Sequence, residues 1–180
     1  MKRRLFLGLC SLLLLTLSGC GGDKIKGDLR MLSFHVETSP SMPPGMREEA
    51  AMPDSGQVVR FNPKSLLTSN DTVGVELREV PSTKELVFRF VFTQKGAQEL
   101  YQESSISVGR LMVTKINGRP FSAARITGPI DNGEWWTPVP KNITKEQALE
   151  LQQKTQETLS KVQESLKKQR DRTKPLGSRD

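Results

Sequence analysis

The sequence predicts an α+β domain, with a helix packed on a mainly antiparallel sheet and a long helix toward the C-terminus. Three observations predict this class. Apolar and polar residues alternate in several short segments, which is the period of a half-buried strand. A helical pattern lies between the most apolar of these segments and a hairpin signal, which gives the central order β-α-β-β. Residues 143–173 contain neither Pro nor Gly, so one long helix can form there.

The N-terminal part of this domain is predicted to hold short strands joined by irregular chain. Alternation predicts a strand at residues 32–36, a short strand at 57–61 and another over 73–77. Between the first two, residues 39–56 include four prolines. We therefore expect a loop without a regular element in that stretch.

The strongest predicted strand is residues 86–92, which place four large apolar side chains on one face. Thr93 follows as the predicted N-cap of a helix that runs to about Glu103. Helical spacing predicts that the buried face of this helix consists of Ala97, Leu100 and Tyr101.

A hairpin and a long helix complete the predicted domain. The hairpin covers residues 111–125 and turns at Asn117-Gly118, a pair that accepts positive backbone angles. Thr144 and Gln147 form a capping box at the start of the long helix. The apolar stripe of this helix is thin and consists of Ala148, Leu151, Leu159, Val162 and Leu166.

The N-terminus has the features of an export signal. A positive cluster precedes an apolar run of about a dozen residues, too short to span a bilayer. Leu17-Ser18-Gly19-Cys20 resembles the lipobox of bacterial lipoproteins. This resemblance implies that residues 1–19 are removed and that the thiol of Cys20 carries a lipid. An ordinary secretory signal followed by a chance cysteine is the alternative.

Composition excludes several classes of site and partner. Only Cys10 and Cys20 are present, so we expect no disulfide and no thiolate metal site in the mature body. The net charge of +7 lies at the two ends, because residues 20–140 hold 14 basic and 14 acidic side chains. No nucleic-acid partner is therefore expected. Residues 141–180 hold ten basic and six acidic side chains, and we predict that this end lies near anionic lipid or a partner.

Catalytic chemistry is not predicted. His35 is the only histidine. Its place on the polar face of the first strand predicts an exposed or half-exposed side chain rather than a catalytic base. Glu48, Glu49 and Asp131 lack the spacing of a calcium site. We expect no enzyme activity, no metal, no cofactor and no small-molecule substrate.

Two features are candidates for contact with a partner. Trp135 and Trp136 are adjacent, so on a strand their side chains point to opposite faces and one is expected at the surface. The alternative is that this second tryptophan packs under the last helix or against Pro138. Met42 and Met46 offer soft apolar contacts from the predicted loop, for which a plain connector is the alternative.

Several segments share their order and spacing with one known family. They are residues 88–97, 108–110, 117–119, 122–126, 129–133 and 144–148. Together they resemble the periplasmic head subdomain of SecD and SecDF, the protein-export membrane proteins. The resemblance implies an α+β head that contacts an emerging preprotein, although no individual contact residue carries over. We expect this sequence to hold no counterpart of the transmembrane helices or of the second periplasmic segment of that family.

These inferences divide the chain into four parts: a signal peptide at 1–19, a tether at 20–28, a SecD head-like domain at 29–155 and a basic helical or disordered tail at 156–180. We expect a lipid-anchored envelope protein, on the periplasmic side of the outer membrane in a Gram-negative cell, that binds unfolded polypeptide or export machinery. The alternative is a structural envelope lipoprotein whose basic tail contacts lipid or a partner subunit.

Overall fold

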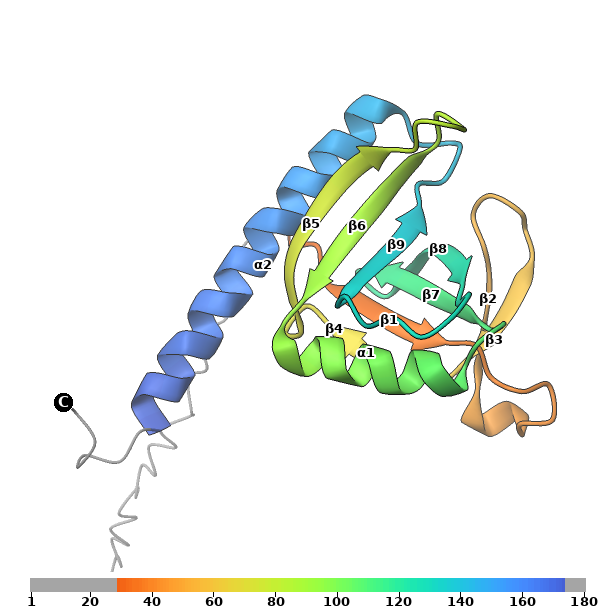
Figure 1. The fold of residues 1–180 in the computed structure, drawn as a ribbon, viewed down its shortest axis with the longest axis horizontal. Helices are drawn as coiled ribbons and strands as arrows, with labels where there is room; N and C mark the ends of the chain where they lie inside the picture. The colour runs from red at the N-terminus through yellow and green to blue at the C-terminus, as the bar shows by residue number, and fades with distance from the viewer. Residues whose placement is uncertain (1–28, 174–180) are drawn as a thin grey trace, which may run out of the picture.

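A computed structural model describes residues 29–173 of the chain (Figure 1). The predicted signal peptide, Cys20 and the tether lie outside the described residues, as does the end of the tail. The elements in order are β1 (Leu32–Val36), η1 (Pro44–Met46), β2 (Glu48–Ala51), β3 (Val58–Phe61), β4 (Leu67–Thr68), β5 (Thr72–Glu79), β6 (Leu86–Phe92), α1 (Gln94–Ile106), β7 (Leu111–Ile116), β8 (Arg119–Arg125), β9 (Glu134–Pro138) and α2 (Lys145–Thr173).

The strands form two main sheets and a separate hairpin. One sheet has the order β4-β1-β7-β8, the other has the order β5-β6-β9, and β2 pairs with β3. Every pairing is antiparallel. The predicted α+β class and the central β-α-β-β order are confirmed, with β6 in one sheet and the β7–β8 hairpin in the other.

The main core lies between the two sheets. The ring of Phe34, from the four-stranded sheet, packs edge-to-face with the rings of Phe90 and Phe92 at centroid distances of 5.1 and 5.2 Å. Such edge-to-face contacts suit the charge distribution of aromatic rings. Alternate residues of β6 are buried here, which confirms the apolar face predicted for that strand.

Helix α1 lies across one end of the sheets, in contact with β4 and β6 (Figure 1). Its N-cap is confirmed, because Thr93 Oγ1 accepts a hydrogen bond from the N–H of Gly96 at 3.2 Å. The buried stripe consists of Gly96, Leu100 and Ser104, spaced four residues apart. The prediction that Tyr101 is buried was wrong: it lies one residue past this stripe, about 100° around the helix, and is 48% exposed.

The hairpin turn is confirmed. Asn117 and Gly118 have φ angles of 51° and 75°, as a tight two-residue turn requires. Asn117 also fixes the turn to β1, because its Oδ1 accepts a hydrogen bond from the N–H of Met31 at 2.8 Å.

The loop predicted at residues 39–56 was wrong, because this stretch contains η1 and β2. The prolines lie on either side of β2 and not within it, so they do not interrupt its pairing with β3. The β2–β3 hairpin covers the outer face of the four-stranded sheet. A second apolar cluster forms beneath it from Met52, Val59, Phe61 and Val113.

The same hairpin corrects the prediction for His35, which is only 4% exposed. Its Nδ1 lies 2.8 Å from the carbonyl oxygen of Asn62 and its Nε2 lies 2.9 Å from Ser33 Oγ. Burial lowers the pKa of His35. The alternation along β1 correctly separated two faces, but a face that is polar in sequence became covered by a distant segment.

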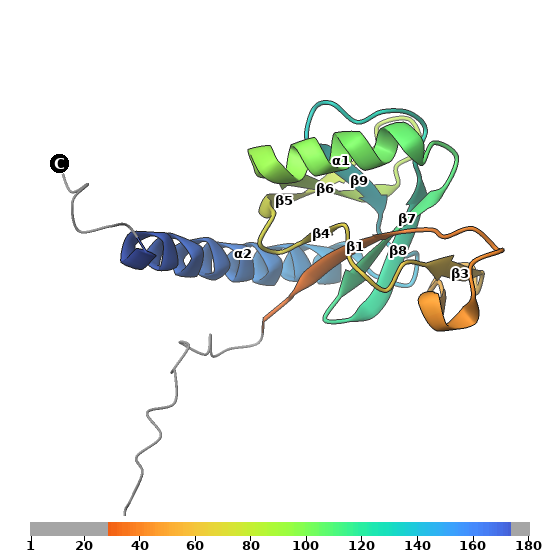
Figure 2. The same cartoon turned by 90° about the horizontal axis from the view of Figure 1, so that it is seen from below.

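Helix α2 begins at the predicted capping box. The N–H of Thr144 donates to Gln147 Oε1 at 2.9 Å, and the N–H of Gln147 donates to Thr144 Oγ1 at 3.3 Å. The helix continues without a break past residue 155, and Leu159 and Val162 beyond that point are buried. The last turns extend away from the body (Figure 2).

Candidate binding surface

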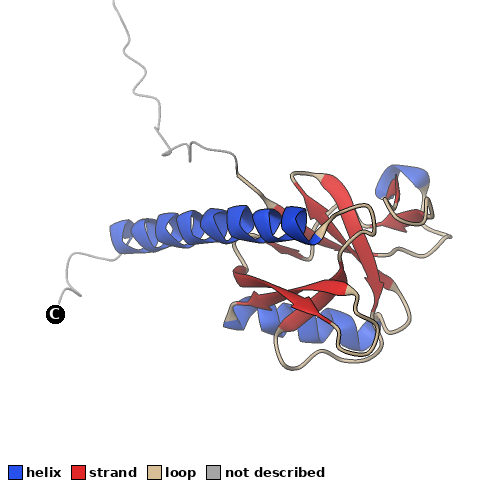
Figure 3. Cartoon of the chain, turned by 90° about the horizontal axis from the view of Figure 1, so that it is seen from above, coloured by secondary structure: helices blue, strands red, loops and turns tan. Residues whose placement is uncertain are grey.

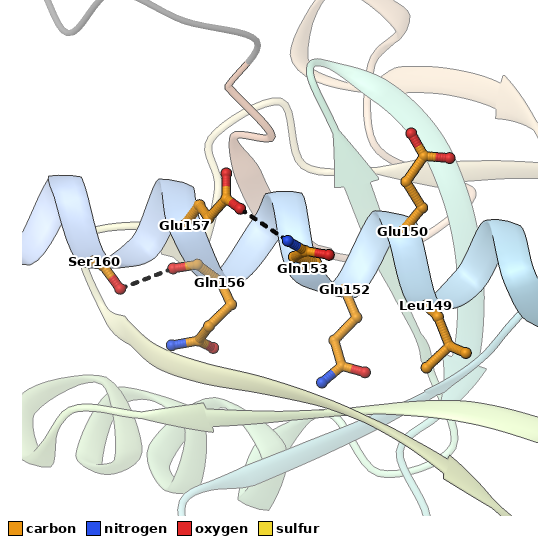
Figure 4. Close-up of a pocket in the computed structure, with 7 residues that line it drawn as sticks. All are labelled: Leu149, Glu150, Gln152, Gln153, Gln156, Glu157 and Ser160. Carbon is orange, nitrogen blue, oxygen red and sulfur yellow. Dashed lines mark hydrogen bonds between the residues drawn. The ribbon is translucent and has the colours of Figure 1, made fainter.

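The sheet β5-β6-β9 has two edges, and α2 runs along the one formed by β5 (Figure 1). Figure 3 shows from another side that the long helix lies beside the strands. Two glutamine side chains of α2 accept hydrogen bonds from backbone N–H groups of β5. Gln156 Oε1 is 3.0 Å from the nitrogen of Val75, and Gln152 Oε1 is 3.2 Å from the nitrogen of Leu77. Figure 4 shows both side chains pointing from the helix toward the neighbouring strand.

A third glutamine extends this contact along the strand. Gln163 Nε2 donates to the carbonyl oxygens of Thr72 at 3.1 Å and Asn70 at 3.3 Å. We call Gln152, Gln156 and Gln163 the glutamine cap.

The spacing of the glutamine cap has a geometric reason. Residues four apart on a helix are separated by about 6 Å along its axis. Backbone groups two residues apart on a strand, which point to the same edge, are separated by about 6.7 Å. Gln152 and Gln156 can therefore serve Leu77 and Val75 in turn. The helix replaces the hydrogen bonds that another strand would make.

The outer face of the same sheet carries a row of charged side chains across its three strands. The register places Arg89 of β6 opposite Glu76 of β5 and Trp136 of β9. Arg89 Nε donates to Glu134 Oε2 at 2.7 Å, and its Nη2 donates to the other oxygen of Glu134. Arg89 Nη1 donates to Glu76 Oε2 at 3.0 Å. Arg89 thus bridges both outer strands.

These contacts keep the row charged. The hydrogen bonds from Arg89 lower the pKa of Glu134, and the indole of Trp136 adds a smaller contribution in the same direction. Arg78, followed by Arg89, lowers the pKa of Glu76. Glu134 and Glu76 in turn raise the pKa of Arg89. The hydrogen bonds to the two carboxylates hold the guanidinium in one orientation.

Trp136 lies on this outer face and is 44% exposed, whereas Trp135 is 5% exposed and belongs to the core. A strand sends neighbouring side chains to opposite faces, which explains the difference. Two hollows share Trp136 as part of their walls. One is lined also by Arg78, Glu79, Val80, Pro81, Val87, Arg89 and Glu134. The other lies toward residues 125–132.

This surface, which we call the Trp136 face, combines Trp136 and Val87 with the bridged charges of Arg89, Glu134 and Glu76. An exposed indole beside aliphatic side chains can hold an apolar side chain of a partner. The fixed charges beside it can orient polar groups of the same partner.

The structure does not bring the methionine candidates to this face. Met46 is 62% exposed at the end of η1, and Met42 is half-buried just before that turn. Neither lines the hollows that Trp136 lines. The charged row was also missed in the sequence, where Arg89 was visible as a charge within an apolar strand. Its partners Glu76 and Glu134 are identifiable only once the strand register is known.

The described part of the chain holds neither a candidate metal cluster nor a candidate membrane-spanning helix. Within residues 29–173, no group of three or more His, Cys, Asp or Glu side chains is placed to hold a metal ion. In the same residues, no helix has both the length and the apolar character needed to cross a membrane.

Comparison with known proteins gives a likeness of structure. No protein family and no curated protein matches the sequence. A solved structure of SecDF, described as a membrane component that enhances protein export, superposes with a TM-score of 0.52 over 71% of this chain at 14% identity. SecDF in a super-membrane-facing form superposes with a TM-score of 0.51, again over 71% of this chain, at 17% identity.

The match covers only part of each SecDF chain, 62% of the first and 18% of the second. At these identities the likeness is one of fold. It agrees with the sequence resemblance, which identified the same family from short segments. The described part of the chain is a domain with a SecDF-like fold.

Proposed function

We propose that this chain is a lipid-tethered envelope protein whose non-catalytic, SecDF-like domain binds polypeptide or an envelope complex in connection with protein export. The observation that carries the proposal is the Trp136 face, an accessible sheet surface with an exposed indole on a SecDF-like fold. The SecDF of the first comparison is described as enhancing protein export. An exported polypeptide is therefore the first partner to test for this chain.

An extended polypeptide suits the chemistry of this face. Unfolded chains present apolar side chains at short intervals, and Trp136 with Val87 offers an apolar contact for one of them. Such contacts do not depend on one sequence, since an indole packs against many side chains. Glu134 and Glu76 already hold the guanidinium of Arg89 in place, so it can orient polar groups of the bound chain without first becoming ordered itself.

The location follows from the N-terminal sequence. Lipid on Cys20 would hold the domain at a membrane, with residues 20–28 as the tether. Gly21 rather than aspartate after the cysteine favours the periplasmic side of the outer membrane in a Gram-negative cell. Mass spectrometry of the N-terminal peptide tests this part, since the proposal requires an acylated Cys20.

A photoreactive residue at position 136 tests the binding function. We expect benzoyl-phenylalanine in place of Trp136 to crosslink an unfolded exported precursor added to the membrane-bound protein. The matched control places the same residue at Tyr101, an aromatic of similar exposure, 48% against 44%, on α1. Equal crosslinking at both positions would mean nonspecific collision, and none at position 136 would remove the proposed role of this face.

A second candidate is a structural role, in which the domain is a spacer and the basic end of α2 contacts lipid or a partner subunit. The extension of α2 beyond the body favours it (Figure 2). Capture of a single envelope protein at position 136, and no precursor, would support this candidate. Deleting residues from 156 onward is unsuitable as a test, because Leu159 and Val162 are part of the packed domain.

A further inference from the structure

The chain enters the domain beside the point where α2 leaves it. The N–H of Arg30 donates to Thr158 Oγ1 at 2.9 Å, so the start of β1 is fixed to the middle of α2. Val162 is the last buried residue of the helix, and residues 167–172 are all exposed. In Figures 1 and 2 the end of α2 extends from the body on the side where the described chain begins.

The net positive charge of the described chain lies on the part of α2 that extends from the body. Residues 29–160 hold 15 basic and 15 acidic side chains and are neutral. Residues 161–172 hold five basic side chains, against Glu164 and Asp171, which leaves +3. Lys168 forms an ion pair with Glu164 at 2.9 Å along the helix. The domain therefore has a neutral body and a positive end.

The lengths on the two sides of Thr158 are similar. From Thr158 to Thr173 the helix extends about 22 Å, at about 1.5 Å per residue. The ten residues from Cys20 to Arg30 can span at most about 35 Å, the length of a fully extended chain. If Cys20 is held at a bilayer, the positive end of α2 can reach the same surface.

We infer that residues 161–172 of α2 are a second membrane contact, which binds anionic lipid headgroups and sets the orientation of the domain on the bilayer. This inference rests on the lipid anchor proposed above. Basic side chains close to an anionic leaflet are attracted to it, and the attraction falls off within a Debye length. With two points of attachment, the Trp136 face takes a defined direction relative to the membrane.

Energy transfer from the domain to the membrane tests this contact. The mature lipidated protein, carrying a donor dye on Gln169→Cys, is reconstituted in vesicles that contain an acceptor on a lipid headgroup. We expect transfer to rise about twofold when 30% phosphatidylglycerol is added to phosphatidylcholine, and to return to the lower level in about 0.5 M NaCl. A donor on Ser82→Cys, in the exposed turn between β5 and β6, should not show this rise.

Charge variants separate this attraction from a general effect of charge. Reversing Lys167, Lys168 and Arg170 to Glu should abolish the rise. Reversing three exposed basic residues of the body, Lys64, Arg110 and Lys141, changes the net charge equally and should leave the rise intact. An unchanged rise in the α2 variant would overturn the inference. So would a rise that requires added envelope protein instead of anionic lipid.

Failure of the lipid anchor has a different signature. A protein without lipid on Cys20 would not remain on vesicles of phosphatidylcholine alone, whatever the state of α2. Flotation of that same protein with vesicles containing 30% phosphatidylglycerol then tests the helix contact by itself. Salt-sensitive flotation that is lost in the α2 charge variant would support the contact between the helix and the membrane. Equal flotation with neutral and anionic vesicles would contradict it.

Discussion

The two edges of the β5-β6-β9 sheet are treated differently by the chain. At β5, the glutamine cap of α2 supplies hydrogen bonds to the strand backbone. At the other edge, β9 pairs with β6 alone within the described residues, and Trp136 stands at the surface. Exposed edges invite pairing with other chains, and a helix can prevent this by supplying side-chain hydrogen bonds to the edge strand. The edge formed by β9 lies next to β8 instead, and the outer face between the two edges stays accessible to a partner.

Among the changes at the β5 edge, the largest effect should come from loosening α2. Leu159 is fully buried in the main core, and Leu159→Ala should reduce the free energy of unfolding by about 2 to 5 kcal/mol through lost burial and the cavity left behind. Leu149, on the same helix, is 50% exposed, so Leu149→Ala is the matched control and should cost less than about 1 kcal/mol. Urea unfolding measures both. Equal losses in the two variants would mean that α2 does not pack as described.

Removing the glutamine cap should have a smaller effect on stability and a specific effect on association. Gln152→Ala with Gln156→Ala should cost about 2 kcal/mol, because two strand N–H groups then depend on water. The opened β5 edge should increase concentration-dependent self-association, measured by light scattering. Gln153→Ala is the control, since Gln153 bonds only with Glu157 on the same helix. Closure of the edge by the cap would be refuted if the double variant scattered no more than this control.

Local signals in the sequence predicted the elements that border this sheet. Thr93 marked the start of α1, Thr144 with Gln147 marked the start of α2, and alternation gave β6. Each signal acts within a few residues, where backbone hydrogen bonds and side-chain period decide the structure. The same reasoning separated buried Trp135 from exposed Trp136 without saying which was which.

What the sequence did not show depends on contacts between distant segments. His35 is buried because residues 48–61 fold over its strand, and the alternation along β1 carries no trace of that cover. Gln152 and Gln156 look like ordinary surface residues of a helix until β5 is placed beside them. The row from Glu76 through Arg89 to Glu134 likewise needs the register of three strands.

The charged row on the Trp136 face predicts a pH dependence. Because Arg89 lowers the folded-state pKa of Glu134, ionised Glu134 adds stability above its unfolded pKa, about 4.3, and this is lost as the pH falls through the folded pKa. Glu134→Gln should therefore be less stable than the parent at pH 7, with a difference that shrinks as the pH falls below about 4. In an Arg89→Gln background the substitution should have little pH-dependent effect. A pH-dependent difference that persists in that background would mean that a group other than Arg89 lowers the pKa of Glu134.

The smallest change in stability should accompany the largest change in binding. Trp136→Ala removes a partly exposed indole from the outer face, so we expect a loss of less than about 1 kcal/mol in the free energy of unfolding. Binding of an unfolded precursor, measured by fluorescence anisotropy, should weaken roughly tenfold or more, as for a central aromatic contact. Trp135→Ala reverses this pattern, because the neighbouring side chain belongs to the core and its loss should cost about 3 to 5 kcal/mol.

The two tryptophan variants remove the same side chain from adjacent positions of one strand. The chemistry of the removed group therefore cannot explain a difference between them. If Trp136→Ala leaves precursor binding unchanged, the accessible face of the sheet is not the contact. A crosslink from position 136 would then report that the precursor passes near this face and not that the indole binds it.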